Sequence, residues 1–200
     1  MTLGPSGYQQ IRMHGLGDVL REHRRSRPPM TAVVDGDIRL SWPDLDSRVN
    51  QLAQLMLADK LGEGSRILWL GQNSFRLLEC ILAAAKIGAM VCPINWRMSA
   101  TEITAVIEDF TPHFIIWQQQ DIGDTAKQAR ANTSHSCRWI AHDDTAAEGY
   151  EALLAAQADI DPNLAIHSDC AVVAMYTAAF DGKPNAAILS QSAMLSQSLM

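Results

Sequence analysis

The chain has 200 residues, of which 48% are hydrophobic, and this length and composition exclude disorder as its general state because they suffice for a packed core. Its net charge of -6, from 16 basic and 22 acidic residues without a dense basic run, argues against nucleic acid as a partner.

No segment predicts a membrane span or a secretory signal. The longest apolar stretch, residues 80–91, contains Lys86 and is shorter than the roughly 20 residues that cross a bilayer. The first 15 residues lack the apolar centre of a signal peptide. None of the four cysteines forms a C-x-x-C pair, so neither a disulfide framework nor a zinc site is indicated. We therefore expect a cytoplasmic protein with no transmembrane segment and no metal site.

The first elements expected are a short helix and a β-hairpin. Leu16, Val19 and Leu20 share one helical face, and two consecutive prolines end that helix. The runs 31–34 and 38–42 are extended and apolar, and the Asp-Gly dipeptide between them tolerates the positive φ of a tight turn.

From residue 43 onward, helices and strands alternate. Capping patterns, in which a serine is followed three residues later by an acidic residue, begin at Ser41 and Ser99 and predict helix starts there. Pro93 is expected to end the strand that precedes the second of these helices. Helices are predicted over 43–60, 75–87, 100–111, 121–131 and 148–158, and strands over 67–70, 90–92, 114–117, 138–141 and 170–176.

This alternation predicts an α/β fold, a three-layer sandwich in which helices cover both faces of a mainly parallel sheet. We divide the chain into an N-terminal arm with a short helix (1–30), an α/β subdomain (31–168), and a strand, loop and helix start (169–200). Ligands of open parallel sheets bind at the carboxyl ends of the strands, so the loops after these strands are the candidate sites.

The loop after Tyr176 has the richest chemistry of these loops. Small residues, Gly182 and Lys183 follow an apolar strand there, and such a loop can turn backbone N–H groups and a cation toward phosphate. The Walker pattern is not met, because Thr177 stands where its first glycine should be and Pro184 follows the lysine. Local composition alone favours a plain surface turn with an exposed lysine.

Three stretches fall in the order of one protein family. The first, LSWPDLDSRVNQLAQLM, resembles a helix entry of the AMP-forming adenylating superfamily. The second, NSFRLLECILAAAKIGAMVCPINWRMSATEITAVIED, resembles a long helix-strand-helix stretch of that superfamily. The third, DCAVVAMYTAAFDGKPNAAILSQ, resembles its phosphate-binding signature Y-T-S-G-T-T-G-x-P-K-G-V-x-L-S-H. That superfamily contains acyl-CoA synthetases, adenylation domains of nonribosomal peptide synthetases, and luciferases. The resemblance covers about residues 15 to 200 and implies part of the large N-terminal domain of such an enzyme, closest to acyl-CoA synthetases.

The resemblance implies that Thr177, Gly182 and Lys183 bind ATP, with Mg²⁺ and CoA as the further cofactors. The loop also departs from the family signature. Ala178, Phe180 and Asp181 stand where the signature has hydroxyl residues, and Ala179 and Ala186 where it has glycines. Asn185 replaces its lysine and Gln191 its histidine. The loop thereby loses hydroxyl donors and gains a carboxylate, so we expect weaker ATP binding through its side chains.

The implied function is that of an acid–thiol ligase, in which a carboxylic acid, such as a fatty acid, reacts with ATP and is then passed to CoA. In the family the acid pocket and the catalytic residues lie beyond residue 200, so no catalytic residue is assigned. The sequence stops inside an apolar helix pattern, so we expect a fragment that is inactive alone and prone to self-association through exposed apolar surface.

Three other interpretations stay open at this point. A non-catalytic relative acting as a binding or interaction module would explain the altered loop, and an ordinary nucleotide-binding α/β domain would explain the fold. His135, Cys137, His142, Asp143 and Asp144 could suggest a metal cluster, but their spacing fits no zinc pattern and favours surface loops around a strand. Asn95, Trp96 and Arg97 follow the strand near residue 90 and receive no role.

Overall fold

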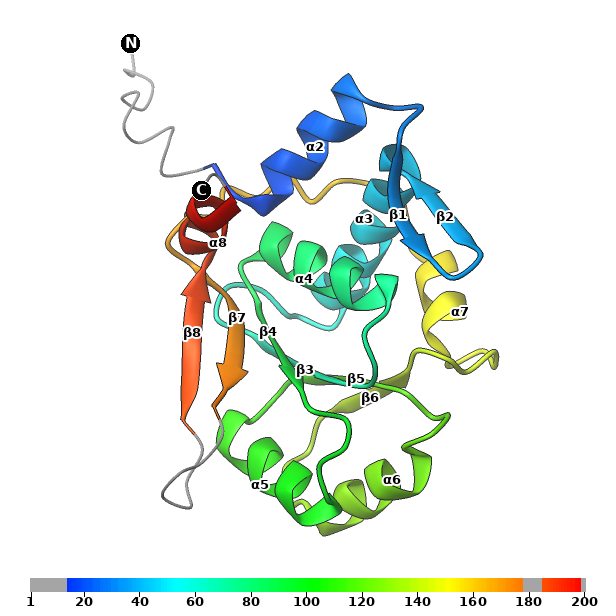
Figure 1. Ribbon diagram of the computed structural model, residues 1–200, viewed down its shortest axis with the longest axis vertical. Helices are drawn as coiled ribbons and strands as arrows, with labels where there is room; N and C mark the ends of the chain where they lie inside the picture. Colours follow the sequence, from blue (N-terminus) through cyan, green and yellow to red (C-terminus); the bar gives the residue numbers. More distant parts are fainter. Residues whose placement is uncertain (1–13, 178–184, 199–200) are drawn as a thin grey trace.

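A computed structural model describes residues 14–177 and 185–198 (Figure 1). Within them, helices alternate with the strands of a six-stranded sheet, and a separate two-stranded sheet forms a hairpin. In chain order the elements are α2 (Leu16–Ser26), β1 (Thr31–Asp35), β2 (Ile38–Ser41), α3 (Trp42–Ala58), β3 (Arg66–Leu70), α4 (Phe75–Ile87), β4 (Met90–Ile94), α5 (Ala100–Phe110), β5 (Phe114–Trp117), α6 (Gly123–Asn132), β6 (Arg138–Ala141), α7 (Tyr150–Ala155), β7 (Ala171–Tyr176), β8 (Ala186–Ser190) and α8 (Gln191–Ser198).

The large sheet has the strand order β6-β5-β3-β4-β7-β8. Its first five strands are parallel to their neighbours, and β8 is antiparallel to β7. In the centre, Leu70 at the end of β3 pairs with Ile94 of β4 and with Trp117 of β5, so these three strands end at one level. The mainly parallel sheet predicted from the sequence is confirmed.

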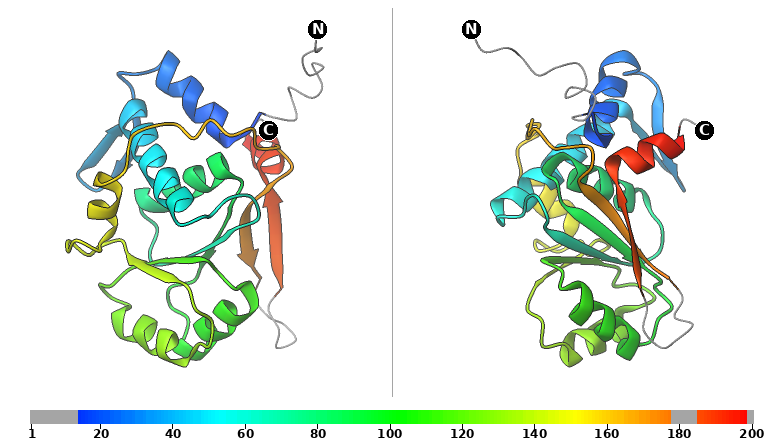
Figure 2. Two further views of the ribbon diagram at one scale, coloured as in Figure 1. Left: turned by 180° about the vertical axis from the view of Figure 1, so that it is seen from behind. Right: turned by 90° about the vertical axis from the view of Figure 1, so that its left-hand side faces the viewer.

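Helices cover both faces of this sheet, as predicted. In Figure 1, α3 and α4 lie above the sheet and α5 and α6 lie below it, and the turned views of Figure 2 agree. Successive side chains of a strand point to opposite faces. Ile67 and Trp69 of β3 accordingly belong to the core under α3 and α4, whereas Leu68 and Leu70 belong to the core with α5. The three-layer sandwich therefore contains one hydrophobic core on each side of the sheet.

Both predicted capping boxes are present. The Ser41 N–H donates to the Asp44 carboxylate at 3.0 Å, and the Asp44 N–H donates back to the Ser41 hydroxyl at 3.3 Å. Ser99 and Glu102 make the same reciprocal pair at the start of α5. Each box satisfies backbone donors that the first turn of a helix leaves unpaired, and this explains why both helix starts could be located from the sequence.

The predicted hairpin is also confirmed, and it caps a helix. The Ser74 side chain makes no hydrogen bond at the start of α4, although its position is that of a cap. Instead, the Phe75 N–H donates to the Asp35 carboxylate at 2.9 Å, which ties the end of β1 to this helix. The hairpin is thereby fixed on the α4 side of the molecule.

Three details differ from the prediction. Pro93 does not end β4, which continues to Ile94, because the fixed φ of proline is compatible with an extended strand and only one donor is lost. The helix predicted over 148–158 spans only Tyr150–Ala155. The strand β8 is absent from the prediction. Its run is short, and it becomes a strand because it pairs with β7. The division of the chain at residues 30 and 168 stays a prediction.

An extended segment, residues 156–170, carries the chain from α7 to β7 and is called the strap here. It must cross the molecule, because β6 is one edge of the sheet and β7 lies beyond β4. Figure 2 shows the strap running over the helices on the α3 side. The side chains of Gln51 and Gln54 in α3 donate to strap carbonyls at 3.4 and 2.7 Å. These bonds hold the residues after α7 in an extended conformation against α3, which is consistent with the short length of α7.

A buried lysine joins the strap to the helical layer. The Lys86 side chain is fully buried, and its Nζ donates to Asp46 and Asn50 of α3 at 2.6 Å and to Asp161 of the strap at 2.8 Å. Three acceptors satisfy the three donors of the ammonium group. Through these contacts one side chain joins α4, α3 and the strap, and Asn50 adds a second link by donating to Asp159 of the strap at 3.2 Å.

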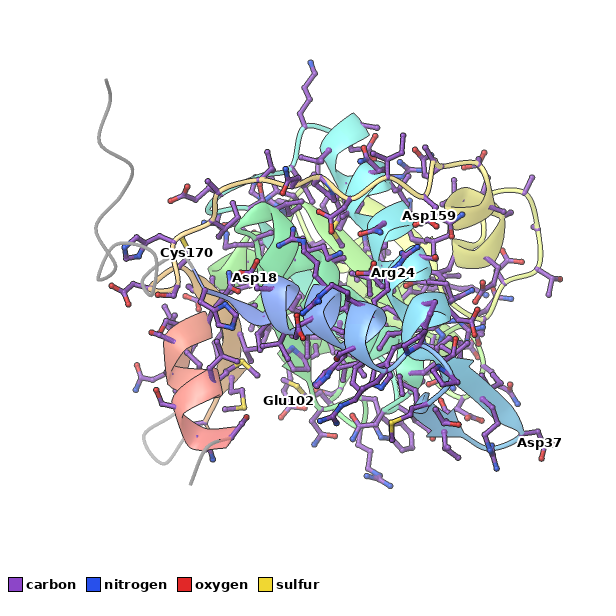
Figure 3. The ribbon with its side chains drawn as sticks, turned by 90° about the horizontal axis from the view of Figure 1, so that it is seen from above. Asp18, Arg24, Asp37, Glu102, Asp159 and Cys170 are labelled. Carbon is purple, nitrogen blue, oxygen red and sulfur yellow. The ribbon has the colours of Figure 1, made fainter. Side chains whose placement is uncertain are left out.

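Arginines of α2 complete this network. Arg21 makes a bidentate ion pair with Asp161 at 2.8 and 2.7 Å, and Arg24 donates to Asp46 at 2.8 Å. Figure 3 shows Arg24 on α2 and Asp159 on the strap, whose charged groups lie 4.0 Å apart. Burial alone would raise the pKa of Asp161, but the bonds from Arg21 and Lys86 outweigh it and leave that pKa well below its ordinary value.

A second anchor lies at the start of α8. Gln191 is 1% exposed, its side-chain amide donates to the Ala85 carbonyl at 3.1 Å, and its side-chain carbonyl accepts from the Leu16 N–H at 2.9 Å. A Cβ at Gly15 would lie 2.3 Å from that carbonyl oxygen, so only glycine allows the approach. The strand β8 is therefore held at its carboxyl end by α2 and α4.

None of the described helices is long and apolar enough to span a bilayer.

Replacing Lys86 tests the network. The change Lys86→Met keeps much of the side-chain volume but leaves Asp46, which is 2% exposed, with less positive charge around it. Since an uncompensated buried carboxylate is costly, we expect the free energy of unfolding to fall by about 3 kcal/mol. Urea denaturation measures it. Lys127→Met, at an exposed lysine, is the control, and equal effects of the two changes would contradict the role given to Lys86.

Candidate functional site

The carboxyl ends of the parallel strands form one edge of the sheet, and the candidate site lies there. Leu70, Ile94, Trp117 and Tyr176 end β3, β4, β5 and β7, and each is followed by a loop at this edge. In Figure 1 the ends of β4 and β7 point toward the α5 layer. The structure therefore brings together the loops that the sequence identified as candidates.

Thr177 lies where β7 and β8 separate. Its N–H and its hydroxyl both donate to the Asn185 carbonyl, at 2.8 and 3.1 Å, next to the last strand pair, Tyr176 with Ala186. Both donors of Thr177 are thus engaged in closing the end of the hairpin. Gly182 and Lys183, the other two predicted site residues, lie outside the described residues.

A tyrosine and an aspartate connect this hairpin end to α5. The Tyr176 hydroxyl donates to the Asp109 carboxylate, and the Tyr176 ring packs against the core that contains Ile103 and Phe110 of α5. Burial raises the pKa of Tyr176, and the hydrogen bond to Asp109 raises it further. The phenol consequently stays protonated and able to donate. Sequence analysis missed this pair, because the two residues are 67 positions apart.

Beside the hairpin end, the loop after β4 presents an aromatic ring and a cation. The Arg97 guanidinium lies 4.3 Å from the centre of the Trp96 ring. The Arg97 N–H donates to the Asn95 side chain at 3.0 Å, which fixes the turn. Trp96 is partly buried against the core on the α5 side, so the ring is a firm support for the exposed guanidinium.

The loops after β5 and β6 support one another. The Asp143 carboxylate accepts the N–H groups of Gln119 and Gln120 at 2.6 and 2.7 Å. The Gln118 side chain accepts the Gln72 N–H at 2.9 Å and so joins the loop after β3 to the same rim. These bonds hold the far half of the edge rigid.

The histidine at the end of β6 is buried, contrary to the surface loop that its sequence context favoured. His142 is 5% exposed and stacks on Trp69 with ring centres 4.7 Å apart and planes 9° apart. A Cβ at Gly71 would lie 3.0 Å from its Nε2. Neither ring nitrogen has a hydrogen-bond partner among the described groups, and burial lowers the pKa of His142 below 6.5.

The other members of that group are used separately. The ring of His135 contacts the Pro112 carbonyl at 2.7 Å, and Asp143 binds backbone as described above. Within residues 14–177 and 185–198, no three histidine, cysteine, aspartate or glutamate side chains gather as they would around a metal ion.

The candidate site lies where open parallel sheets bind their ligands. A two-stranded hairpin opens at the carboxyl edge of a parallel sheet, and this is where backbone N–H groups of the connecting residues can surround an anion. Among the described side chains, Arg97 is the exposed cation at this edge and Asp109 the nearby carboxylate. The described part of the site therefore consists of a hairpin end held by Thr177, with one exposed cation and one carboxylate beside it.

Sequence comparison now identifies the family. The model of the AMP-binding enzyme family matches residues 20–200. The chain belongs to this family. The resemblance noted in the sequence is thereby confirmed, and the alternative of an ordinary α/β domain unrelated to adenylation is wrong.

Three known proteins illustrate the relationship. Indoleacetate–CoA ligase of Aromatoleum aromaticum is 28% identical, with 90% of this chain and 35% of that protein covered. A long-chain-fatty-acid–CoA ligase of Mycobacterium tuberculosis is 26% identical, with 88% and 35% covered. The inhibitor-bound N-terminal domain of FACL13 from Mycobacterium tuberculosis superposes with a TM-score of 0.78 at 25% identity, with 88% and 44% covered. The chain thus spans about a third of the length of these ligases and less than half of that domain.

The unpartnered imidazole of His142 generates a prediction about pH. Because its pKa is lower in the folded state than the ordinary 6.5, the unfolded chain binds the proton more tightly, and stability is lost as the pH falls below 6.5. Desolvation is the largest influence on its pKa, and of the charged groups that act on it, Asp143 and Glu151 raise it and Arg76 lowers it. We expect His142→Asn to flatten this part of the stability profile.

Chemical denaturation of the native chain and the variant at pH 5.0, 6.0 and 7.0 measures the effect. His14→Asn, at an exposed histidine, is the matched control and should leave the slope unchanged. An undiminished slope in His142→Asn would show that other groups cause the acid sensitivity.

Proposed function

We propose that this chain is the nucleotide-binding part of an AMP-forming acyl-CoA synthetase. The observation that carries the proposal is the position of the β7–β8 hairpin end: the strands separate at the carboxyl edge of the sheet, where Thr177 binds Asn185. The chain in which this occurs belongs to the AMP-binding enzyme family. Relatives whose names denote acid–CoA ligases support the reaction type.

In the proposed reaction, an oxygen of a carboxylate attacks the α-phosphorus of ATP, and the bond to the β-phosphate oxygen breaks. Pyrophosphate leaves and an acyl-adenylate remains. The sulfur of CoA, having lost its proton, then attacks the acyl carbonyl, and AMP leaves with the bonding electron pair. Positioning the reactants and neutralising phosphate charge supply the acceleration of the first step.

We assign phosphate binding to the segment that begins at Thr177 and includes Gly182 and Lys183. Gly182 allows the backbone to approach the anion, and Lys183 supplies a positive charge. Thr177 contributes by holding the hairpin end, since its own donors bind Asn185. Mg²⁺ bound with ATP would neutralise part of the phosphate charge. It would thereby reduce the repulsion between the phosphates and the Asp181 carboxylate. No catalytic residue is assigned within the 200 residues.

The proposed substrate is a small-molecule carboxylic acid. The names of the two relatives specify indoleacetate and long-chain fatty acids, and we place the acid of this protein in that range of aromatic and aliphatic carboxylates. We place the protein in the cytoplasm, where ATP and CoA are present.

Self-association is a further part of the proposal. Met175 of β7 is 45% exposed and Ile188 of the edge strand β8 is 62% exposed. An apolar strand with an unpaired edge favours contact with another chain. Light scattering on the purified chain tests this part, and a monomer at every concentration would contradict it.

The test of function is acid-dependent exchange of radiolabelled pyrophosphate into ATP. We expect no exchange by the 200 residues alone, and exchange with an aromatic or aliphatic acid in any longer natural reading frame that contains them. Lys183→Ala should reduce that exchange by at least about tenfold, since a charge-assisted phosphate contact is lost. Lys127→Ala is the control. Absence of exchange with every acid, together with no binding of millimolar ATP, would favour the non-catalytic module instead.

A further inference from the structure

Two acidic residues occupy the last turn of α5, where the sequence offers no basic residue. The carboxyl end of a helix carries partial negative charge, so carboxylates are unfavourable there unless another contact compensates them. Glu108 has such a contact, because it accepts bonds from the Thr133 hydroxyl and the Ser134 N–H, both at 2.6 Å, beyond the end of α6. Asp109 has a different one, the hydroxyl of Tyr176.

The bond to Asp109 reaches the hairpin end at its last strand residue. Tyr176 is paired with Ala186 of β8, and the next residue, Thr177, holds the Asn185 carbonyl through two donors. A contact on Tyr176 therefore acts on the position at which both strands leave the sheet. Among the described residues no strand pairs with the other side of β8, which is the edge of the sheet.

The opposite end of the hairpin is held independently. There, Gln191 binds Leu16 and Ala85, so β8 is fixed to α2 and α4 at its carboxyl end. At the end near Thr177, α5 is the helix that contacts the hairpin through a hydrogen bond among the described residues. Loss of that bond would leave the strand ends held by their own pairing and by the packing of the Tyr176 ring, without a directional contact to α5.

We propose that Asp109 is a positioning residue for the nucleotide site: by accepting a hydrogen bond from the Tyr176 hydroxyl, it fixes the backbone at Thr177 and Asn185 relative to α5. This inference rests on the proposed function. Asp109 itself touches neither nucleotide nor acid, and its effect passes through the tyrosine. The pair couples the α5 layer to the place where phosphate is bound.

The experiment uses four variants of the 200-residue chain and two measurements. Asp109→Ala removes the acceptor, Asp109→Asn keeps an acceptor oxygen, and Tyr176→Phe removes the donor while keeping the ring. Glu108→Gln is the matched control in the same helical turn. Amide hydrogen exchange at Thr177 and calorimetric titration with Mg·ATP are measured for each variant.

We expect Asp109→Ala and Tyr176→Phe to accelerate exchange at Thr177 by about tenfold and to weaken Mg·ATP binding several-fold, because a bond to a charged acceptor is lost. Asp109→Asn should restore most of both quantities. Glu108→Gln should accelerate exchange near Ser134 and leave Thr177 unchanged.

The inference is overturned if Asp109→Ala lowers overall stability without a selective change at Thr177, or if Asp109→Asn fails as badly as Asp109→Ala. If the unaltered chain binds no Mg·ATP, the proposed function is weakened, and the exchange at Thr177 still decides whether Asp109 positions the hairpin end. The two failures are therefore distinguishable.

Discussion

The ammonium group of Lys86 is the contact through which the parts of this fold are assembled. The chain must return from β6, at one edge of the sheet, to β7 on the far side of β4, and it does so in a strap without regular structure. A strap of this kind gains little from its own backbone. Lys86 supplies the missing attachment, since its three hydrogen bonds join two helical residues and Asp161 inside the protein. The arginines of α2 then enclose the same carboxylates.

This attachment matters for the proposed function because it holds β7 beside β4. Beside β4, the strand ends next to the loop of Trp96 and above the last turn of α5. A hairpin that opens there faces the edge at which parallel sheets bind ligands. The charged network lies at the amino end of β7 and determines where this strand lies. The candidate site lies at the carboxyl end of the same strand.

Local signals explain what could be predicted from the sequence. The capping boxes at Ser41 and Ser99, the left-handed Gly88 after α4, and the apolar periodicity of each helix depend on neighbouring residues only. The family resemblance added the location of the segment proposed to bind phosphate. Gly182 and Lys183 lie outside the described residues, so their assignment rests on that resemblance.

Long-range contacts explain what was missed. Asp161 lies 75 residues from Lys86, and Tyr176 lies 67 from Asp109, so neither pair leaves a pattern in the chain. The strand β8 forms because it pairs with β7. His142 is buried because Trp69 and Gly71 provide a surface for its ring. In each case the deciding information is which distant segments become neighbours.

The most direct test is to map the amides of the described residues while Mg·ATP is titrated into the 200-residue chain. Our account predicts saturable chemical-shift changes at the carboxyl edge, at Gly71, Trp96 and Thr177. Residues at the amino edge, such as Ser65 and His113, should not respond. Shifts confined to the amino edge, or no saturable shift at millimolar nucleotide, would contradict it.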